Sequence, residues 1–287
     1  MSEAKKRTSF VRSFIDFARE SPLGALGVAI LVVMILVALL APLIAPYDPL
    51  EGDFFNIRKG PSSTHWLGTD DLGRDVLSRL MYGARISLLV GFSAVLLGDS
   101  LGFITGVISG YVGGKTDLLS QRVLEVLLAF PGLILATVIV VGLGTGISTV
   151  IIAIAITRIP ASNRVVRSVV LSVKRSDYVT AAKLAGASPI RIMFRHIAPQ
   201  TVAPFLVIAS AHLGIAITSE AALSFLGIGV PPPNPSWGTM IGGAVASQFR
   251  PPWWLATFPG IAITLTVFAA NLTGDALRDK LDPNLRT

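Results

Sequence analysis

The sequence contains no cysteine, and its 287 residues include only three histidines and few charged side chains. Without a thiol there is no disulfide, thiolate metal site or cysteine nucleophile, and cysteine usage says nothing about the compartment. Charged residues make up 14% of the chain and apolar residues 52%, with a mean hydropathy of +0.69. That leaves too little polar surface for a soluble globule of this length, so the composition predicts a membrane-embedded protein.

Motifs of other functional classes are missing as well. There is no His-Glu-x-x-His and no Gly-x-Ser-x-Gly, so an intramembrane enzyme has no positive support. Residues 109–116 come close to a phosphate-binding loop, but Ser109 stands where that loop needs glycine, and an apolar block precedes it. The net charge of +7 is spread mostly between apolar blocks, so we expect no nucleic-acid partner.

Six apolar blocks approach the ~20 residues that a bilayer-crossing helix needs. They cover residues 23–45, 86–110, 123–144, 147–166, 199–226 and 255–275, with outer loops at 46–85 and 227–254. The first block exceeds the ~7 to 15 apolar residues of a signal peptide, so we interpret it as a permanent anchor. Arg158 and Pro160 interrupt the fourth block. The predicted fold is an all-α polytopic membrane protein with six transmembrane helices.

The distribution of lysine and arginine predicts the orientation. Eighteen of the 24 lie at the N-terminus, around Lys115 and Arg122, between residues 158 and 195, and in the C-terminal tail. Because basic residues in short loops resist translocation, we expect these segments and both termini on the cytoplasmic side. Ahead of the first span, apolar residues at helical spacing predict a helix in the membrane interface over residues 1–22, and a disordered basic tail is the alternative.

Residues 177–199 are too polar to span a membrane and too regular for a linker. Asp177 is expected to cap a helix over residues 178–185, and Gly186 to end it in the left-handed conformation. Ser188 and Pro189 are expected to begin a second helix at the membrane surface. One flank of the first helix has little side-chain bulk and suits a groove on another protein: Tyr178, Ala181, Ala182 and Ala185. A hairpin that only joins two spans fits this pattern equally well.

Among the polar residues inside the predicted spans, four are candidates for the pathway or for contacts between helices: Asp99, His212, Glu220 and Asn271. An acid at mid-membrane costs ~2.5 to 3.5 kcal/mol on insertion scales, so Asp99 and Glu220 must face protein or water. They either line a substrate route or hydrogen-bond helix to helix. We favour the second interpretation, since Glu220 lies near the outer end of its span.

The first outer loop carries a cluster of possible cation ligands: His65, Asp70, Asp71 and Asp75. Their oxygen and imidazole groups suit divalent metals. A helix start explains them better, because Thr69 or Asp70 can cap a helix that leads through Arg74 and Arg79 into the second span. We therefore predict no metal site.

Residues 177–199 resemble a cytoplasmic loop shared by permease subunits of ABC importers. That loop has two alanines, a glycine four residues after the second, and a hydrophobic-x-Pro ending, matched here by Ala181, Ala182, Gly186, Ile197 and Pro199. Thr180 replaces the family's usual acidic residue without altering the bend or the small-residue flank. The resemblance implies that an ATPase subunit docks on Asp177, Tyr178, Ala181, Ala182, Ala185, Gly186 and Ala187.

Other segments narrow the resemblance. Residues 65–88, 219–241 and 275–286, with the end of the first span at 41–49, resemble the dipeptide/oligopeptide/nickel permease family and its C-type, second permease subunit. Together they extend over nearly the whole chain. The resemblance implies a type I ABC-importer permease fold over residues 23–285 in a bacterial inner membrane.

The family also implies partners and a cargo. The partners are a second permease, two ATP-binding subunits that bind ATP and Mg, an extracytoplasmic binding protein and membrane lipids, so this chain needs no cofactor. The outer-loop residues expected to meet the binding protein are Trp66, Asp70, Asp71, Arg74 and Trp237. Tryptophans at a membrane interface need no partner, so interface anchors are the alternative. The expected cargo is a short peptide, with nickel or another small solute as the alternative. An ion-coupled secondary transporter using Asp99 or Glu220, and a scaffold that moves no solute, are rivals from other classes.

Overall fold

The computed structural model describes residues 18–246 and 251–281, and over these ranges the chain is helical apart from turns, loops and one isolated β-bridge. The long helices are α2 (Pro22–Ile44), α3 (Val76–Val112), α6 (Ile147–Val173), α9 (Ala198–Phe225) and α11 (Trp253–Leu281). The shorter ones are α4 (Gly114–Leu128), α5 (Gly132–Leu143), α7 (Asp177–Leu184), α8 (Pro189–Ile192) and α10 (Trp237–Ala246). A 3-10 turn, η1 (Phe54–Asn56), and a π-helical turn, η2 (Met193–Ile197), complete the described elements. Most of the expected interfacial helix falls outside the described residues.

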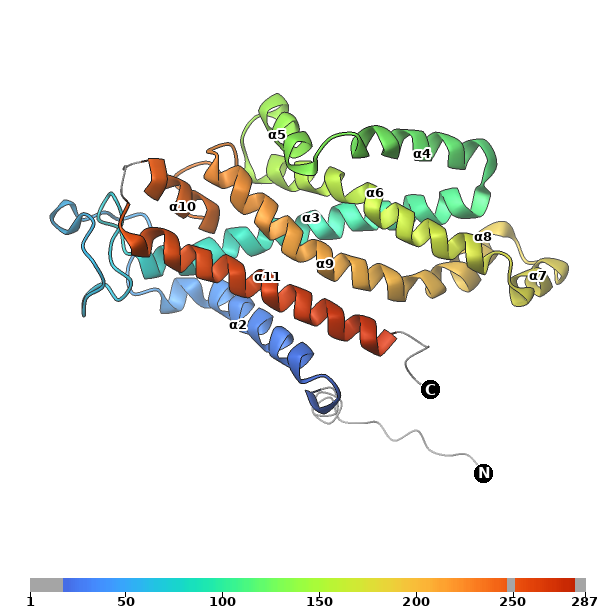
Figure 1. Ribbon diagram of the computed structural model, residues 1–287, viewed down its shortest axis with the longest axis horizontal. Coiled ribbons are helices and arrows are strands. Elements are labelled where there is room, and N and C mark those ends of the chain that lie inside the picture. Colours follow the sequence, from blue (N-terminus) through green and yellow to red (C-terminus); the bar gives the residue numbers. More distant parts are fainter. Residues whose placement is uncertain (1–17, 247–250, 282–287) are drawn as a thin grey trace.

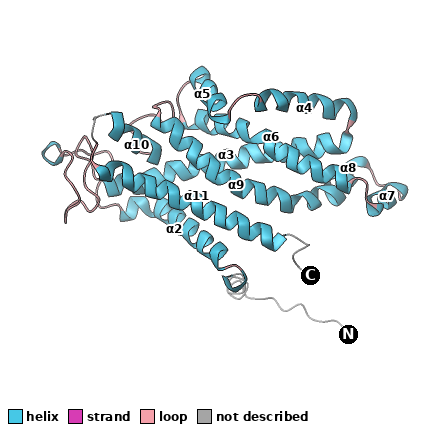
Figure 2. Ribbon diagram, in the orientation of Figure 1, coloured by secondary structure: helices cyan, strands magenta, loops and turns pink. Residues whose placement is uncertain are grey.

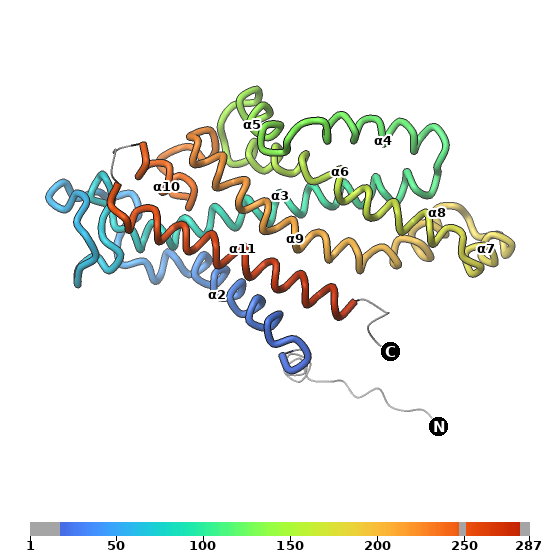
Figure 3. The backbone as a smooth tube through the Cα atoms, viewed as in Figure 1, coloured from blue at the N-terminus to red at the C-terminus, as the bar shows by residue number. Residues whose placement is uncertain are grey.

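The long helices run along one another in an elongated bundle (Figure 1). The loop before α3 and the short helix α10 lie at one end, and α7 lies at the other (Figures 1 and 3). Helix α2 begins, and α11 ends, toward the end that carries α7 (Figure 1). Most non-helical connections gather at the two ends of the bundle, while the break between α4 and α5 lies partway along it (Figure 2). This arrangement suits a bilayer, because backbone N–H and C=O groups in the hydrocarbon layer must be hydrogen-bonded within the protein, as they are in helices.

Among the described residues, five helices are long and apolar enough to cross a membrane, and the pair α4 and α5 makes a sixth span if counted as one. These two helices meet at a 90° bend, so the span expected at residues 123–144 is not a single straight helix. Pro131 occupies the cap position of α5. A proline ring has no N–H to donate to the preceding turn, which explains the break.

Helix α3 starts at Val76, whereas the sequence predicted a span from residue 86. The prediction counted Arg79 within the outer loop at residues 46–85, although it also expected a helix to lead through Arg79 into the span. In the structure Arg79 is buried, its Nη1 donates to the Pro49 carbonyl at 2.9 Å, and its Nε lies 3.3 Å from Asp70 Oδ2. Because loop residues hydrogen-bond the Arg79 guanidinium, this charged residue can lie within α3, and the helix extends beyond the apolar block. The first outer loop therefore ends at residue 75.

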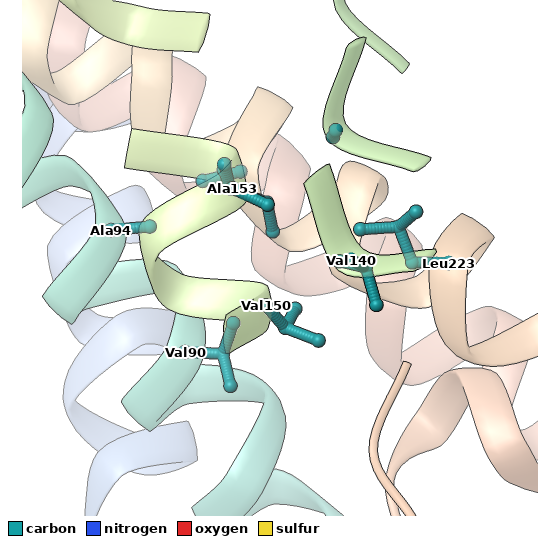
Figure 4. Close-up of a cluster of buried hydrophobic side chains, with 9 residues drawn as sticks. Val90, Ala94, Val140, Val150, Ala153 and Leu223 are labelled. Carbon is teal, nitrogen blue, oxygen red and sulfur yellow. The ribbon is translucent and has the colours of Figure 1, made fainter. Parts of the chain in front are cut away.

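Helix α6 continues through Pro160 to Val173, past the end of the block predicted at residue 166. At the N-terminal end of α6 a buried apolar cluster joins α3, α5, α6 and α9 through Val90, Val140, Val150 and Leu223 (Figure 4). Below that cluster, four glycines of α3 face α6 at four-residue spacing: Gly98, Gly102, Gly106 and Gly110. A Cβ on Gly98 would stand 2.3 Å from the Ala155 carbonyl oxygen, so the two backbones are in close contact.

Candidate functional site

Helix α7 begins at Asp177, and Ser176 takes the cap position that the sequence assigned to Asp177. The expectation that Asp177 caps the helix was wrong by one residue, and no side chain caps this end. Asp177 in the first turn still has its negative charge near the positive end of the helix dipole.

Gly186 ends α7 as predicted. Its φ is +78°, and its N–H donates to the Lys183 carbonyl at 3.0 Å, while the Ala187 N–H donates to the Ala182 carbonyl at 3.1 Å. These two bonds form a Schellman motif, which satisfies carbonyls left open at a helix end. The prediction of a glycine stop is confirmed.

The second helix starts as predicted but does not remain separate. Ser188 Oγ accepts from the Arg191 N–H at 3.3 Å, and Pro189 is the first helical residue. The backbone then passes from α8 through η2 into α9, so residues 189–225 form one continuous helical rod. The expected helix at the membrane surface is therefore the N-terminal extension of the fifth predicted span.

A buried apolar cluster supports this segment from beneath. Val179 of α7, Ile192 of α8 and Ile197 of η2 are buried against residues of α3 and α6, among them Val107 and Val170. These side chains fix α7 on the ends of three spans.

The outer side of α7 stays accessible. Asp177, Tyr178, Ala181, Ala185 and Gly186 are exposed. Ala182 and Ala187 instead pack on the buried cluster, so the small-residue flank is narrower than predicted. The sequence interpretation also missed Leu184, whose side chain is 85% exposed beside this flank. A large apolar side chain that protrudes beside small residues can insert into a pocket on a partner protein.

In the middle of the bundle, Asp99 and His212 lie together. His212 Nδ1 hydrogen-bonds to Asp99 Oδ1 at 2.7 Å, and Ser162 Oγ donates to the same oxygen at 2.6 Å. Asp99 is 1% exposed, and its Oδ2 has no hydrogen-bond partner among the described residues. The three residues come from α3, α9 and α6, so this geometry favours the helix-to-helix interpretation of Asp99 and His212. Ser162 was not anticipated.

Glu220 and Asn271 do not join this cluster. Glu220 is fully buried near the outer end of α9, where Ser224 Oγ donates to its Oε1 at 2.7 Å. Its Oε2 is the other buried side-chain oxygen without a partner in the described part of the chain. Asn271 lies where α11 passes Gly214 of α9.

Asp75 caps α3, not Thr69 or Asp70 as expected. Its Oδ2 accepts from the Ser78 N–H at 2.8 Å, and its Oδ1 lies 3.0 Å from His65 Nδ1. Asp70 Oδ2 accepts from Arg74 Nε at 2.7 Å. Asp71 pairs with Arg58 at 2.5 Å. These carboxylates hold the loop together, and within residues 18–246 and 251–281 no group of three or more His, Asp or Glu side chains is arranged to hold a metal ion.

The outer loop exposes aromatic side chains around a cavity of 710 Å³ lined by Tyr47, Phe54, Phe55 and His65. Phe55 is 90% exposed and Trp66 70%. Trp237 does not belong to this surface, contrary to the prediction, because it is 1% exposed and its Nε1 donates to the Leu80 carbonyl at 3.1 Å. Gly83 leaves the space beside α3 into which the indole packs.

Comparison with known proteins agrees with this architecture. Residues 102–287 match the family model of the binding-protein-dependent transport system inner membrane component, and residues 9–61 match the N-terminal TM domain of oligopeptide transport permease C. The chain is 44% identical over 270 residues to a di/tripeptide transport system permease protein of Pseudomonas aeruginosa, covering 92% of this chain and 89% of that protein.

Two further relatives carry a different substrate in their names. A glutathione transport system permease protein of Pectobacterium atrosepticum is 42% identical over 282 residues, covering 98% of this chain and 93% of the relative. One from Escherichia coli O1:K1 is 46% identical over 256 residues, covering 89% and 84%. The chain therefore belongs to the family of binding-protein-dependent transport system inner membrane components, as a C-type permease subunit of an ABC importer whose ATPase is a separate protein.

Proposed function

We propose that this chain and a second permease form the path by which short peptides cross the inner membrane. Two ATPase subunits drive the transport, and a binding protein delivers the peptide to the outer face. The observation that carries this proposal is the segment 177–199, whose accessible small-residue flank rests on a buried base shared by three spans. Because the segment and the three spans share this buried cluster, we expect a displacement of the segment to be passed on to the spans.

Bulky substitutions on the accessible flank test the docking. Ala181→Trp and Ala185→Trp fill the flank without touching the buried cluster, so we expect loss of ATPase binding and of ATP-driven uptake, with normal folding. Lys115→Trp is the matched control, since Lys115 is exposed on α4 outside the segment. Uptake by the complete importer and co-purification of the ATPase are the measurements. Normal values for both Ala variants would contradict docking at this flank.

The substrate we propose is a peptide of two or three residues. Relatives are named for di/tripeptide and for glutathione transport, and glutathione is itself a tripeptide. A competition assay on the cognate binding protein, with dipeptides, tripeptides, glutathione and nickel chelates, tests this choice. Tight binding of a nickel chelate and of no peptide would favour the alternative cargo.

On the outer side we propose that Trp66, Asp70, Asp71 and Arg74 meet the binding protein, together with Phe54 and Phe55, which the sequence interpretation did not include. In this orientation both termini and α7 face the cytoplasm. Because the natural chain has no cysteine, Phe55→Cys and Ala185→Cys each introduce a single thiol. A membrane-impermeant maleimide applied to spheroplasts should label the first and spare the second. Labelling of Ala185→Cys but not of Phe55→Cys would show that the membrane orientation is the opposite of the one we propose.

An ion-coupled secondary transporter remains the competing class. It predicts uptake without ATPase subunits and a route through Asp99 or Glu220. The contacts of Asp99 with His212 and Ser162 favour a role between helices over one in an ion route. Gradient-driven uptake by this chain in vesicles without any ATPase would overturn our proposal.

A further inference from the structure

Asp99, Ser162 and His212 connect three spans near the middle of the bundle. We call them the polar clamp. Asp99 belongs to α3, Ser162 to α6 and His212 to α9, and both contacts converge on one carboxylate oxygen. All three side chains are buried, so lipid and water do not compete for these bonds.

Helices α3 and α6 also adhere through their backbones. The glycines of α3 bring the two helices so close that a Cβ on Gly102 would stand 2.6 Å from Ser162 Cβ. Lipid is as apolar as the side chains, so close backbone packing and polar contacts hold helices together in a membrane. These two helices therefore behave as one unit.

Helix α9 lacks such a glycine stripe toward this unit. Its Gly214 faces Val267 and Asn271 of α11 instead. Phe103 and Phe205 add one edge-on ring contact between α3 and α9, with centroids 4.9 Å apart. At the depth of Asp99, the His212 bond is the polar tie between α9 and the α3–α6 unit.

Helix α9 is also the direct continuation of the docking segment. The backbone runs from α8 through η2 into α9 with no loop between them, so a displacement of α7 and α8 enters α9 at its cytoplasmic end. The apolar cluster around Val179 and Ile197 joins the helices at that end. At the opposite end the cluster of Val90, Val150 and Leu223 joins the same three helices. Between these two apolar clusters, the polar clamp adds a polar contact that holds α9 to the unit.

We propose that the polar clamp makes α3, α6 and α9 move as one rigid body when the ATPases displace α7, with Asp99 and His212 as positioning residues of the transport cycle. This inference rests on the proposed function of α7. Asp99 Oδ2 remains without a partner, and Arg158, one turn before Ser162, adds a positive charge that interacts with Asp99. Loss of the Asp99 charge would free α9 to slide or splay against α6, so that ATP hydrolysis would no longer open the path.

Spin labels test this motion in the assembled importer, with cysteine-free partner subunits. Ser168→Cys on α6 and Val202→Cys on α9 are exposed label sites outside the clamp. We expect the same narrow distance distribution without nucleotide and in the vanadate-trapped state, and broadening in the trapped state when Asp99→Asn is added. A distribution that shifts between states in the parent protein, or stays narrow in Asp99→Asn, would overturn the clamp.

Transport stoichiometry gives the second measurement, with labelled dialanine or glutathione as the probe, whichever the wild-type importer moves. We expect Asp99→Asn and Ser162→Ala to lower the substrate moved per ATP, by about tenfold for Asp99→Asn, while hydrolysis continues. Thr218→Val is the matched control, since Thr218 bonds within its own helix, to the Gly214 carbonyl at 2.9 Å. If the wild-type importer transports with ATP and Asp99→Asn moves as much substrate per ATP as the wild type, the polar clamp is refuted and the proposed function stands. A wild-type chain that moves neither probe with ATP defeats the proposed function and the clamp together.

Discussion

Alanine substitutions along the glycine stripe of α3 should destabilise the protein in an order set by the spacing to α6. A Cβ at Gly98 would meet the Ala155 carbonyl oxygen at 2.3 Å, and one at Gly106 the Asn163 carbonyl oxygen at 2.8 Å. At Gly110 the nearest atom is a side-chain carbon, Val170 Cγ1, at 2.9 Å. Ordinary contact begins at 3.4 Å, so Gly98→Ala forces the helices apart by about 1 Å against rigid backbone.

Overpacking of this kind costs about 1 to 3 kcal/mol, and alanine recovers up to about 1 kcal/mol through its higher helix propensity. We expect a net loss of about 1 to 2 kcal/mol for Gly98→Ala, less for Gly106→Ala, and almost none for Gly110→Ala, where a side chain can shift. Gly142→Ala is the control, because Gly142 is exposed on α5 and a Cβ there would have no atom of the described residues within 4 Å beyond its own helical turns.

Reversible unfolding in mixed detergent micelles, followed by circular dichroism, gives these free energies of unfolding. The order Gly98, Gly106, Gly110, with Gly142→Ala neutral or up to about 1 kcal/mol more stable, supports the close packing of α3 on α6. Equal effects at all four positions, or a Gly98→Ala variant as stable as wild type, would refute it.

Three further substitutions have distinct expected outcomes. Gly186→Ala meets no atom within 4 Å but keeps a φ of +78°, so it should cost about 1 kcal/mol and speed amide exchange in the last turn of α7, as hydrogen-exchange mass spectrometry would detect. Trp237→Phe removes the indole N–H that donates to the Leu80 carbonyl and leaves unfilled space at a buried site, so it should cost about 1 to 3 kcal/mol, measured by detergent unfolding with Trp66→Phe as the exposed control. Asp75→Ala removes the cap of α3 and should cost about 1 to 2 kcal/mol, whereas Asp75→Asn, which still caps, should lose less.

Local chemistry made the docking segment predictable. The glycine stop and the Ser188–Pro189 start depend on neighbouring residues, and the structure has both within a residue of their expected positions. The sequence did not predict that α8 continues into α9. Arg195 and His196 are polar and suggested an end of the apolar span, but they lie on a turn that remains helical.

Contacts between distant spans were harder to foresee. Asp99 and His212 are 113 residues apart, and the sequence around each residue does not predict a contact with the other. The four-residue spacing of the glycines from Gly98 to Gly110 is typical of a helix that packs closely on another helix. It predicts that a second span lies close to Asp99, but it does not say which one. Trp237 looked like an outer-loop aromatic, but the gap at Gly83 allows it to be buried.

Cross-linking from α7 to the ATPase tests the account most directly. The chain has no native cysteine, so Ala185→Cys carries a single reactive thiol on the accessible flank, and Phe55→Cys carries one on the outer loop. With a short bifunctional reagent and the complete importer, we expect Ala185→Cys to join the ATPase subunit, with a yield that changes on ATP binding, and Phe55→Cys never to do so. Absence of any cross-link from Ala185→Cys in an importer that still transports would contradict the claim that α7 receives the driving force.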